Sequence, residues 1–255
     1  MYRFQSLEIS DVGPFRQSHV LDLSGKFVGI FGGNGTGKST IARCLLADVP
    51  KSKLHISGQR SPTVPLWMQS LGDVQDQVVD SGVASESLAQ LMSTFHISGA
   101  RQAKFELHLT RVLSDITRPK ALWWSEAKGE SSEFLDLTVQ CQPDGHLSVY
   151  SKASGTDLNW GFQARGEQVA LQVATSCALR RLDVDEFDVP CVCDLAFGAL
   201  DGLTRRAVFQ ALLQEMPQLV VLDHEQVFTE MGIRARYGLN LTADLRNSEL
   251  SRTQE

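Results

Sequence analysis

A glycine-rich stretch, GGNGTGKS at residues 32–39, follows the apolar run KFVGIF and precedes IARCLLADV, whose apolar residues have helical spacing. The pattern G-x-x-x-x-G-K-S therefore lies between a predicted buried strand and a predicted helix, the context in which it holds phosphate. Glycines let main-chain N–H groups curl around phosphate oxygens, and the helix N-terminus adds its positive dipole. This stretch constrains the chain to an α/β fold with a phosphate loop.

The residues of this loop have separate expected roles. Lys38 can reach the β- and γ-phosphates of a nucleotide, and Ser39 can ligate Mg²⁺. A Gly-rich turn with a surface lysine is the alternative interpretation. The predicted nucleotide-binding residues of the loop are Gly32, Gly33, Asn34, Gly35, Thr36, Gly37, Lys38, Ser39 and Thr40.

Apolar and alternating segments extend the fold along the chain. Strands are predicted at residues 4–10, 20–23, 26–31, 188–194 and 218–223, and helices at 41–49, 167–182 and 203–216. Residues 134–142 and 146–152 are predicted to form a hairpin because Pro-Asp-Gly lies between them. Alternation of strands and helices favours a mostly parallel central sheet flanked by helices, after an N-terminal antiparallel β region.

Other segments carry weaker patterns. Residues 51–65 are rich in Ser, Gly and Pro and are predicted to be irregular, and ESLAQLMSTF (86–95) is a candidate amphipathic helix. The apolar segment KFELHLTRVL (104–113) lies in the middle of the chain, and the polar tail RNSELSRTQE is expected to fray. We expect a single domain with four parts: 1–60, with the β region and phosphate loop; 61–160, inserted helical and hairpin segments; 161–240, the second half of the site; and the tail 241–255.

Composition narrows the class of protein. The length of 255 residues suits one α/β domain or two lobes sharing a sheet, and a net charge of −6 argues against a generally DNA-coating protein. Five scattered cysteines indicate reduced thiols rather than disulfides or metal ligands. No apolar run approaches the roughly 20 residues that cross a bilayer, and the N-terminus MYRFQSLEISD has no signal-peptide pattern. A cytoplasmic protein is expected.

The order of features resembles the ABC-type ATPase heads of the RecF, SMC and SbcC-like group, over most of the chain. LEISDVGPFRQSHVLDL looks like their opening hairpin, and QARGEQ at the start of the predicted helix 167–182 is similar to their signature, which reads SRGQ in RecF-like proteins. The resemblance makes Arg165 and Gly166 contacts to a γ-phosphate bound by an opposite subunit, although Ala164 lacks the usual serine hydroxyl. It also makes Arg16 a nucleotide contact; a solvated arginine is the alternative.

The stretch DLAFGALD completes the resemblance. Asp194 matches the Walker B aspartate that holds Mg²⁺, and Asp201 matches the D-loop aspartate, with the spacing of the family's DEPxxxLD. His224 lies where the family has its switch histidine. Gln69 is the first candidate for the family's Q-loop glutamine, with Gln140 and Gln142 as alternatives. The resemblance thus implies ATP and Mg²⁺ as ligands, Lys38, Asp194, His224 and Gln69 as catalytic residues, and Ser39 and Asp194 as metal ligands.

Leu195 departs from the family because it occupies the position of the catalytic glutamate; the Phe-Gly that follows at 197–198 is similar to DndD-like defence ATPases. A leucine can neither orient nor deprotonate water, and loss of a positioned base costs about 10²- to 10⁴-fold in rate. Slow turnover with intact ATP binding is therefore expected, and Leu195→Glu is expected to raise turnover.

These features predict an ATP-binding head that dimerises or joins a heteromeric complex, as a switch for a nuclease or other effector in DNA repair, DNA maintenance or anti-phage defence. DNA is a candidate ligand because basic residues outnumber acidic ones within residues 1–60, although scattered solvated charge explains the same count. A non-hydrolysing scaffold subunit and the ATPase subunit of a membrane transporter are the alternatives. A small-molecule kinase explains less, because it accounts for neither signature nor D-loop.

Overall fold

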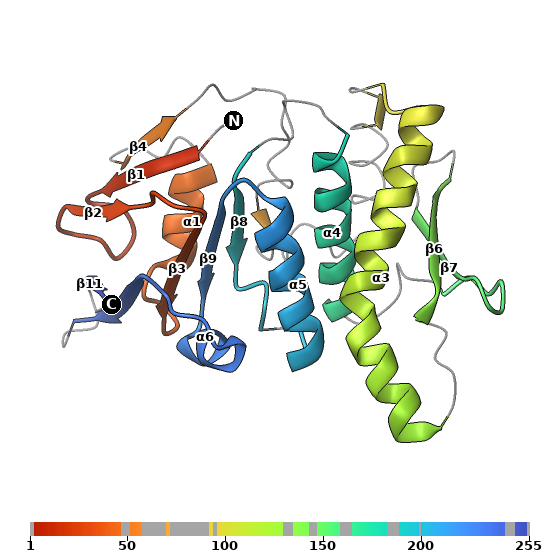
Figure 1. Cartoon of the computed structure of the whole chain (residues 1–255). Helices are drawn as coiled ribbons and strands as arrows, with labels where there is room; N and C mark the ends of the chain where they lie inside the picture. The colour runs from red at the N-terminus through yellow and green to blue at the C-terminus, as the bar shows by residue number, and fades with distance from the viewer. Residues whose placement is uncertain are drawn as a thin grey trace. The chain divides into compact units, whose positions relative to one another are not determined.

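The structure is a computed structural model that describes residues 3–46, 52–57, 70–71, 92–93, 96–129, 135–142, 147–158, 165–182, 189–198, 200–242 and 248–253. The chain divides into two compact units, and most of their elements are labelled in Figure 1. Unit 1 comprises Met1–Asp73, Asp185–Gly198 and Met216–Glu255, and unit 2 comprises Val74–Val184 and Ala199–Glu215.

Unit 1 contains a six-stranded sheet with the order β11-β10-β3-β9-β8-β5. Its strands are parallel except β11, which runs antiparallel to β10. The central strands β8 and β9 are buried along their whole length, so their sequences are continuous apolar runs rather than alternating ones. The helices α1 and α6 pack against this sheet, which confirms the predicted α/β fold with a mostly parallel sheet. The elements are β3 (Phe27–Gly32), α1 (Lys38–Leu46), β5 (Ser70–Leu71), β8 (Cys191–Asp194), β9 (Leu219–Asp223), α6 (Glu225–Met231), β10 (Tyr237–Leu241) and β11 (Ser248–Arg252).

A second, antiparallel sheet of unit 1 has the order β2-β1-β4, with β1 at Arg3–Ile9, β2 at His19–Asp22 and β4 at Ser52–Ser57. It confirms the predicted N-terminal antiparallel region. The prediction that residues 51–65 are irregular was wrong for β4, which pairs with β1 from Arg3 to Ile9. The pairing satisfies main-chain groups of β1 that would otherwise form an open edge, and this outweighs the Ser-rich local composition.

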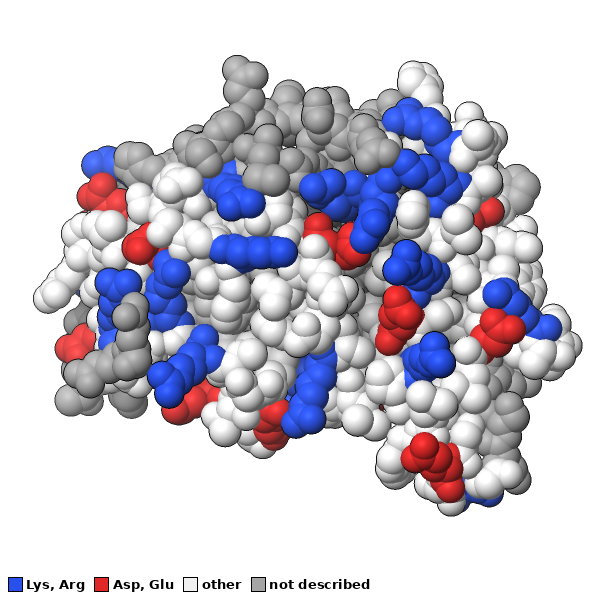
Figure 2. All heavy atoms as spheres, in the orientation of Figure 1, with Lys and Arg blue, Asp and Glu red and all other residues white. Residues whose placement is uncertain are grey.

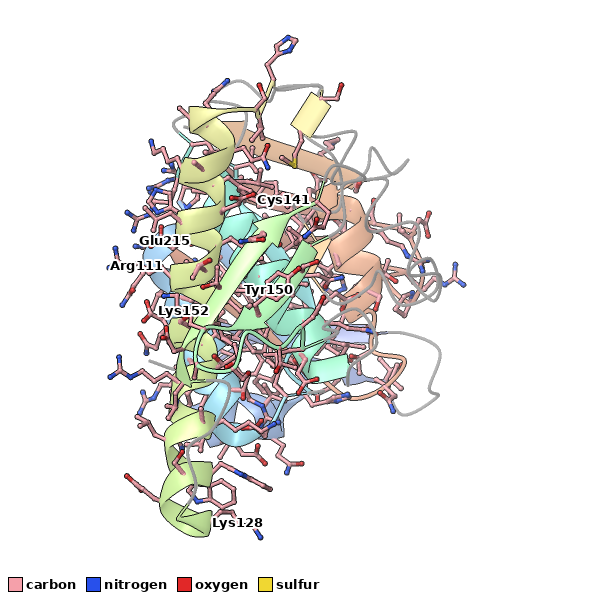
Figure 3. The ribbon with its side chains drawn as sticks, turned by 90° about the vertical axis from the view of Figure 1, so that its right-hand side faces the viewer. Arg111, Lys128, Cys141, Tyr150, Lys152 and Glu215 are labelled. Atoms are coloured by element: carbon pink, nitrogen blue, oxygen red, sulfur yellow. The ribbon has the colours of Figure 1, made fainter. Side chains whose placement is uncertain are left out.

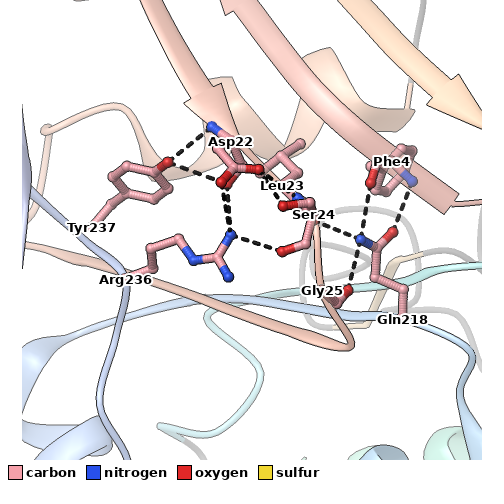
Figure 4. Close-up of polar contacts among 8 residues, drawn as sticks. All are labelled: Phe4, Asp22, Leu23, Ser24, Gly25, Gln218, Arg236 and Tyr237. Atoms are coloured by element: carbon pink, nitrogen blue, oxygen red, sulfur yellow. Dashed lines mark hydrogen bonds and ion pairs between the residues drawn. The ribbon is translucent and has the colours of Figure 1, made fainter. Parts of the chain in front are cut away.

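Gln218 joins the two sheets of unit 1 (Figure 4). Its side chain is fully buried; Oε1 accepts the Phe4 N–H at 2.8 Å, and Nε2 donates to the carbonyls of Phe4, Leu23 and Gly25 at 3.1, 2.7 and 3.1 Å. A buried amide without partners would cost about 1–3 kcal/mol, so this complete set of bonds favours one arrangement of β1 and β2 beside β9.

Arg236 and Tyr237 make a second connection to the same hairpin (Figure 4). The Arg236 guanidinium donates to the carbonyls of Asp22 and Ser24, and the Tyr237 hydroxyl accepts the Asp22 N–H at 2.8 Å. The Ser24 hydroxyl and N–H, which donate to the Asp22 carboxylate, hold the pKa of Asp22 below its ordinary value, with Arg236 as a smaller contribution. These contacts attach the end of β2 to β10.

The described residues of unit 2 include the helices α3 (Ala100–Lys128), α4 (Arg165–Arg180) and α5 (Gly202–Glu215) and the strands β6 (Leu137–Cys141) and β7 (Leu147–Ser151). The predicted hairpin is confirmed by the antiparallel pairing of β6 with β7, and the predicted helices 167–182 and 203–216 correspond to α4 and α5. The segment 104–113 forms part of α3, where buried residues such as Phe105, Leu109 and Val112 recur with helical spacing.

Side chains of α3 cover the open edge of β6. The Glu106 carboxylate accepts the Cys141 N–H, and the Thr110 hydroxyl accepts the Val139 N–H, both at 2.9 Å. Figure 3 shows the hairpin with Cys141 and Tyr150 alongside α3, and Lys128 at the far end of that helix. Burial, and secondarily the Glu106 charge, raises the pKa of the Cys141 thiol to about 12. The edge strand is therefore closed to further pairing at these positions.

Two further predictions concern the end of the chain and its cysteines. The prediction of a frayed tail was wrong for β11, which pairs along β10; long-range pairing outweighs its polar composition because Ser248 finds buried hydrogen-bond partners. All five cysteines are buried free thiols, as the sequence predicts.

Of the candidate helix 86–95, all but residues 92–93 lie outside the described residues. Among the described helices, none is long and apolar enough to cross a membrane.

Candidate nucleotide-binding site

The phosphate loop connects β3 to the N-terminus of α1 in unit 1. Its Lys38 side chain is only 5 % exposed, and the ammonium donates to the carbonyls of Gly32 and Gly33 at 2.8 and 2.7 Å. Thr36 closes the loop further, because its hydroxyl donates to the Gly33 carbonyl at 2.9 Å. Residues 33–35 form an exposed rim, and a Cβ built on Gly35 would meet nothing within 4 Å. The loop thus presents an open glycine rim with a buried cation beneath it.

Gly37 shows why the loop needs glycine at this point. Its φ is +96°, and a Cβ there would lie 2.7 Å from both the Phe15 ring and Pro14. On the same side, a Cβ on Gly13 would lie 2.8 Å from the Thr40 hydroxyl. The segment Gly-Pro-Phe that supports the resemblance to RecF-like heads therefore packs directly on the phosphate loop. Arg16, next in the chain, is exposed, and its role as a nucleotide contact stays a prediction.

β11 supports the loop from the other end of the chain. The Ser248 hydroxyl donates to the Thr36 carbonyl at 2.8 Å, and the Ser248 N–H donates to the Pro14 carbonyl at 2.9 Å. One buried serine thus holds both the loop and the turn that packs on it. Sequence reasoning missed Ser248, because a serine in a polar tail carries no local signal.

Two buried carboxylates lie near Lys38, at the carboxyl ends of adjacent parallel strands. Asp194 ends β8 and is 1 % exposed, and Asp223 ends β9 and is fully buried. Burial lowers the pKa of Lys38, and the charges of Asp194 and Asp223 act in the opposite direction. Three ionisable groups are thereby gathered where an open α/β sheet binds its ligands.

Asp223 was not among the predicted site residues. Its carboxylate accepts the N–H of Phe197 at 3.2 Å through Oδ2 and the N–H of His224 at 2.8 Å through Oδ1. Burial raises the pKa of Asp223, against these two bonds and the charges of His224 and Lys38. The signal was present in VVLDH, where a carboxylate directly follows a buried strand beside the predicted switch histidine.

Leu195, directly after Asp194, has a φ of +54°, in the left-handed region that non-glycine residues seldom adopt. Its N–H donates to the Leu222 carbonyl at 2.9 Å, and two residues later the Phe197 N–H reaches Asp223. The chain leaving β8 is therefore attached to the end of β9 at two points, and the side chain at position 195 brings no polar group.

His224 lies at the N-cap position of α6 with extended backbone and a half-buried side chain. The sequence placed it correctly at the end of a strand of the central sheet. Its predicted role as a switch residue stays a prediction.

The remaining predicted residues belong to unit 2 or fall outside the described residues. Arg165 and Gly166 begin α4, so the predicted signature lies at a helix N-terminus, with Gly166 half-buried. Gln69 lies outside the described residues. Of its alternatives, Gln140 is exposed on β6, and Gln142 donates to the Ser148 and Tyr150 hydroxyls within the hairpin.

Asp201 is the N-cap of α5. Its Oδ1 accepts the N–H groups of Leu203 and Thr204 at 3.1 and 3.0 Å, and its Oδ2 accepts the Thr204 hydroxyl at 2.8 Å. Lys120 of α3 forms an ion pair with Oδ2 at 3.3 Å. Burial alone would raise the pKa of Asp201, but the Thr204 and Lys120 contacts outweigh it and hold the pKa below its ordinary value.

The oxygen donors near the loop fit Mg²⁺. Ser39, in the first turn of α1, offers a half-buried hydroxyl, and Asp194 offers a buried carboxylate. No cluster of three or more His, Cys, Asp or Glu side chains suited to a metal occurs within the described ranges. Proteins usually hold Mg²⁺ with one or two carboxylates together with substrate phosphates.

Comparisons with known proteins agree with this geometry. An AAA domain family matches residues 6–47, which include the second half of β1 and the phosphate loop. No curated protein sequence matches the chain.

Several solved structures are similar to the chain over nearly its full length. The SMC head domain from Thermotoga maritima is 16% identical, with 99% of this chain and 100% of that chain covered and a TM-score of 0.54. An SMC head bound to the C-terminal winged-helix domain of ScpA is 10% identical, with 98% of each chain covered and a TM-score of 0.65. An ATP-binding subunit of an ABC transporter is 14% identical, with 96% and 89% covered and a TM-score of 0.53. The chain therefore has the fold of an ABC-type P-loop ATPase head, of the kind that SMC proteins carry.

Proposed function

We propose that this chain is an ATP-binding head that works as a nucleotide-controlled switch, with slow or partner-dependent hydrolysis. The observation that supports it most is the burial of Lys38 together with two strand-end carboxylates beneath an exposed glycine rim. A buried lysine with carboxylates at the carboxyl edge of a parallel sheet suits a terminal phosphate that needs positive charge.

Each residue of the loop has a defined task in this proposal. The Gly33–Gly35 rim and the N-terminus of α1 receive the phosphates, and no acidic residue in the first turn of α1 opposes them. Lys38 exchanges its bonds to the Gly32 and Gly33 carbonyls for bonds to phosphate oxygens. Ser39 and Asp194 would hold Mg²⁺, which supplies charge to offset that building on the phosphate oxygens.

Assembly with a second subunit is the next part of the proposal. Gly166 near the N-terminus of α4 offers the small residue and positive helix end that a phosphate on an opposite head would approach. One of the structurally similar SMC heads was solved with a winged-helix domain bound. We therefore propose a homodimer or heteromeric complex in which closure on ATP is transmitted to an effector, such as a nuclease.

A basic face on α3 supports a polyanionic ligand such as DNA, and with it a role in DNA repair, DNA maintenance or anti-phage defence. Arg101, Lys104, His108, Arg111 and Arg118 recur with the spacing of one helix face, which also carries Asp115. Burial lowers the pKa of His108, and the charges of Arg181, Lys104 and Arg111 add to this effect while Glu215 opposes it. Figure 2 shows Lys and Arg side chains over the region of α3.

A hollow of about 330 Å³ on this face is lined by residues including His108, Arg111, Gln214 and Glu215, all of unit 2. Figure 3 labels Arg111 and Glu215 on the side of α3 away from the hairpin. In contrast, the basic residues of segment 1–60 support DNA binding less than their count suggests, because Lys38 is buried and Lys53 pairs with Glu8 at 3.4 Å.

The ATP affinity of the Lys38→Ala variant tests the proposal that residues 32–39 bind a nucleotide. Hydrogen bonds to charged groups contribute about 1.5–3 kcal/mol, so ATP should bind roughly 10- to 100-fold more weakly in titration calorimetry. Lys53→Ala, on the exposed β4 edge, is the matched control and should bind ATP like the wild type. Because removal of Lys38 leaves two buried carboxylates uncompensated, Lys38→Arg, which keeps the charge, and the melting temperature of each variant separate lost binding from lost folding. Equal ATP affinity in wild type and Lys38→Ala would contradict the proposal that ATP binds at this loop.

A scaffold subunit that binds but does not hydrolyse ATP is the second candidate, because Leu195 brings no carboxylate. Turnover measured with DNA and partner present separates the two: stimulated turnover that Asp194→Ala abolishes supports the switch, and absent turnover supports the scaffold. A transporter subunit is a third candidate on the fold alone, and co-purification with a membrane protein would favour it.

A further inference from the structure

Asp223 is a carboxylate held in one orientation at the end of β9. It is fully buried, and each of its two oxygens accepts a main-chain N–H, from Phe197 and from His224. Both donors belong to segments that leave the central sheet beside the phosphate loop. Each oxygen retains a second lone pair for a further donor, because an ionised carboxylate has about four acceptor sites.

The strand register places Asp223 next to the position that a catalytic glutamate would occupy. In the parallel pair of β8 and β9, Asp194 is opposite Leu222, and the Leu195 N–H donates to the Leu222 carbonyl. The next residue along β9, Asp223, therefore lies beside position 195, one strand away. Adjacent strands are about 4.8 Å apart, which a side chain or one water can span.

The structure assigns to Asp223 the task that a carboxylate at position 195 would have, namely to orient the attacking water and accept its proton. This inference depends on the proposed function, since it presumes that ATP binds at the loop. In the proposed function Asp194 holds Mg²⁺. The charges of Asp194 and Asp223 both act on Lys38, which is expected to bind the terminal phosphate. Asp223 is therefore the second carboxylate near that phosphate.

Hydrolysis of ATP at this site replaces one bond at the γ-phosphorus by another. The water oxygen forms a bond to the γ-phosphorus while the bond between that phosphorus and the β,γ-bridging oxygen breaks, and its electron pair stays on ADP. One water proton passes to the Asp223 carboxylate and is returned to the phosphate product, so that the aspartate is regenerated. Burial of Lys38, Asp194 and Asp223 together keeps bulk water from this place.

Asp223→Asn tests the inference, because it removes the charge and keeps the side-chain volume. The amide keeps one acceptor and turns its NH2 toward either the Phe197 or the His224 N–H, so the melting temperature is measured beside turnover. We expect ATP turnover to fall by about 100-fold or more. The affinity for a non-hydrolysable ATP analogue should rise at least about threefold relative to ADP, because a negative charge facing the γ-phosphate is gone. Glu225→Gln, two residues away and exposed on α6, is the matched control and should leave both quantities unchanged.

The analogue-to-ADP affinity ratio separates this task from a structural one. A merely structural Asp223 would, when replaced, lower the melting temperature and weaken ADP and analogue equally, and that result would overturn the inference. Unchanged turnover in Asp223→Asn, or wild-type turnover no higher than that of Lys38→Ala, would also overturn it. The proposed function fails on a different observation, namely absence of ATP binding by the wild type.

Leu195→Glu provides an independent check. If Asp223 already supplies the carboxylate, a second one beside it should change turnover less than about threefold in the otherwise unaltered chain. A rise of tenfold or more would show that a base had been missing and would overturn the inference. This expectation reverses the one drawn from the sequence.

Discussion

Two aspartates from the same short stretch, Asp194 and Asp201, differ in what holds them. Asp194 ends a buried strand, is 1 % exposed and acts on the buried Lys38, whereas the Asp201 side chain is 42 % exposed and caps the helix that follows it. The resemblance to ABC-type heads predicted that both are nucleotide-site residues. The difference teaches that two aspartates of one motif can have different surroundings: Asp194 is buried near a charged partner, while capping of α5 and the ion pair with Lys120 account for the contacts of Asp201.

Replacement of each aspartate by alanine should affect ATP affinity very differently, and this is the largest difference that we expect. Asp194→Ala removes a predicted Mg²⁺ ligand, and even outer-shell losses cost about 10- to 100-fold in metal affinity. We expect the Mg²⁺-dependent part of ATP affinity to fall by about 100-fold, so that EDTA no longer affects binding in calorimetry. Asp201→Ala should stay within about twofold of the wild type. Similar losses of ATP affinity in Asp194→Ala and Asp201→Ala would contradict the distinction between the two aspartates.

Glycine substitutions extend the comparison to the main chain around each aspartate. Gly37→Ala, in the phosphate loop, meets Phe15 and Pro14 at 2.7 Å in a backbone with φ +96°, so we expect a loss of about 2 kcal/mol in unfolding free energy. Gly202→Ala, next to Asp201 in the first turn of α5, meets open space and should gain up to about 0.5 kcal/mol. Urea denaturation measures both, and a stabilised Gly37→Ala would contradict the packing of the loop.

Asp201→Ala should have a smaller effect on stability than Gly37→Ala, a loss of about 1 kcal/mol in unfolding free energy at pH 7, as for other lost N-caps. The pKa of Asp201 is held below its ordinary value of 3.8, so its contribution is present above that value and disappears as the pH falls through the folded-state pKa. Unfolding free energies of wild type and variant should therefore converge as the pH falls from 5 toward 3.

Lys120→Ala is the control for the ion pair within that cap. The pair is exposed on both sides, so its loss should cost no more than about 0.5 kcal/mol and should vanish at high salt. A loss as large as that of Asp201→Ala would mean that the ion pair, and not the main-chain capping, stabilises this end of α5.

Residues whose neighbours are close in sequence were predicted well. The loop 32–39 was recognisable because strand, glycines and helix follow one another. The positions of Asp194 and His224 were recognisable because Asp194 ends an apolar strand and His224 directly follows one. Residues whose partners are distant in sequence were missed: β4 depends on β1, Ser248 on Thr36, and Asp223 on Phe197. No local pattern contains those partners, because they are distant in sequence. The hydrogen bond of Asp223 with Phe197 joins residues 26 positions apart, and that of Ser248 with Thr36 joins residues 212 positions apart.

The sequence by itself determined that this chain is an α/β protein with a phosphate loop, and that a leucine follows the strand-end Asp194. Local physics suffices for this, because apolar periodicity and glycine conformations act within a few residues. Only the tertiary structure decided that a carboxylate of the neighbouring strand, Asp223, lies beside that leucine. Strand order and register are set by burial and pairing across the whole chain, so they bring together residues that no stretch of sequence lists side by side.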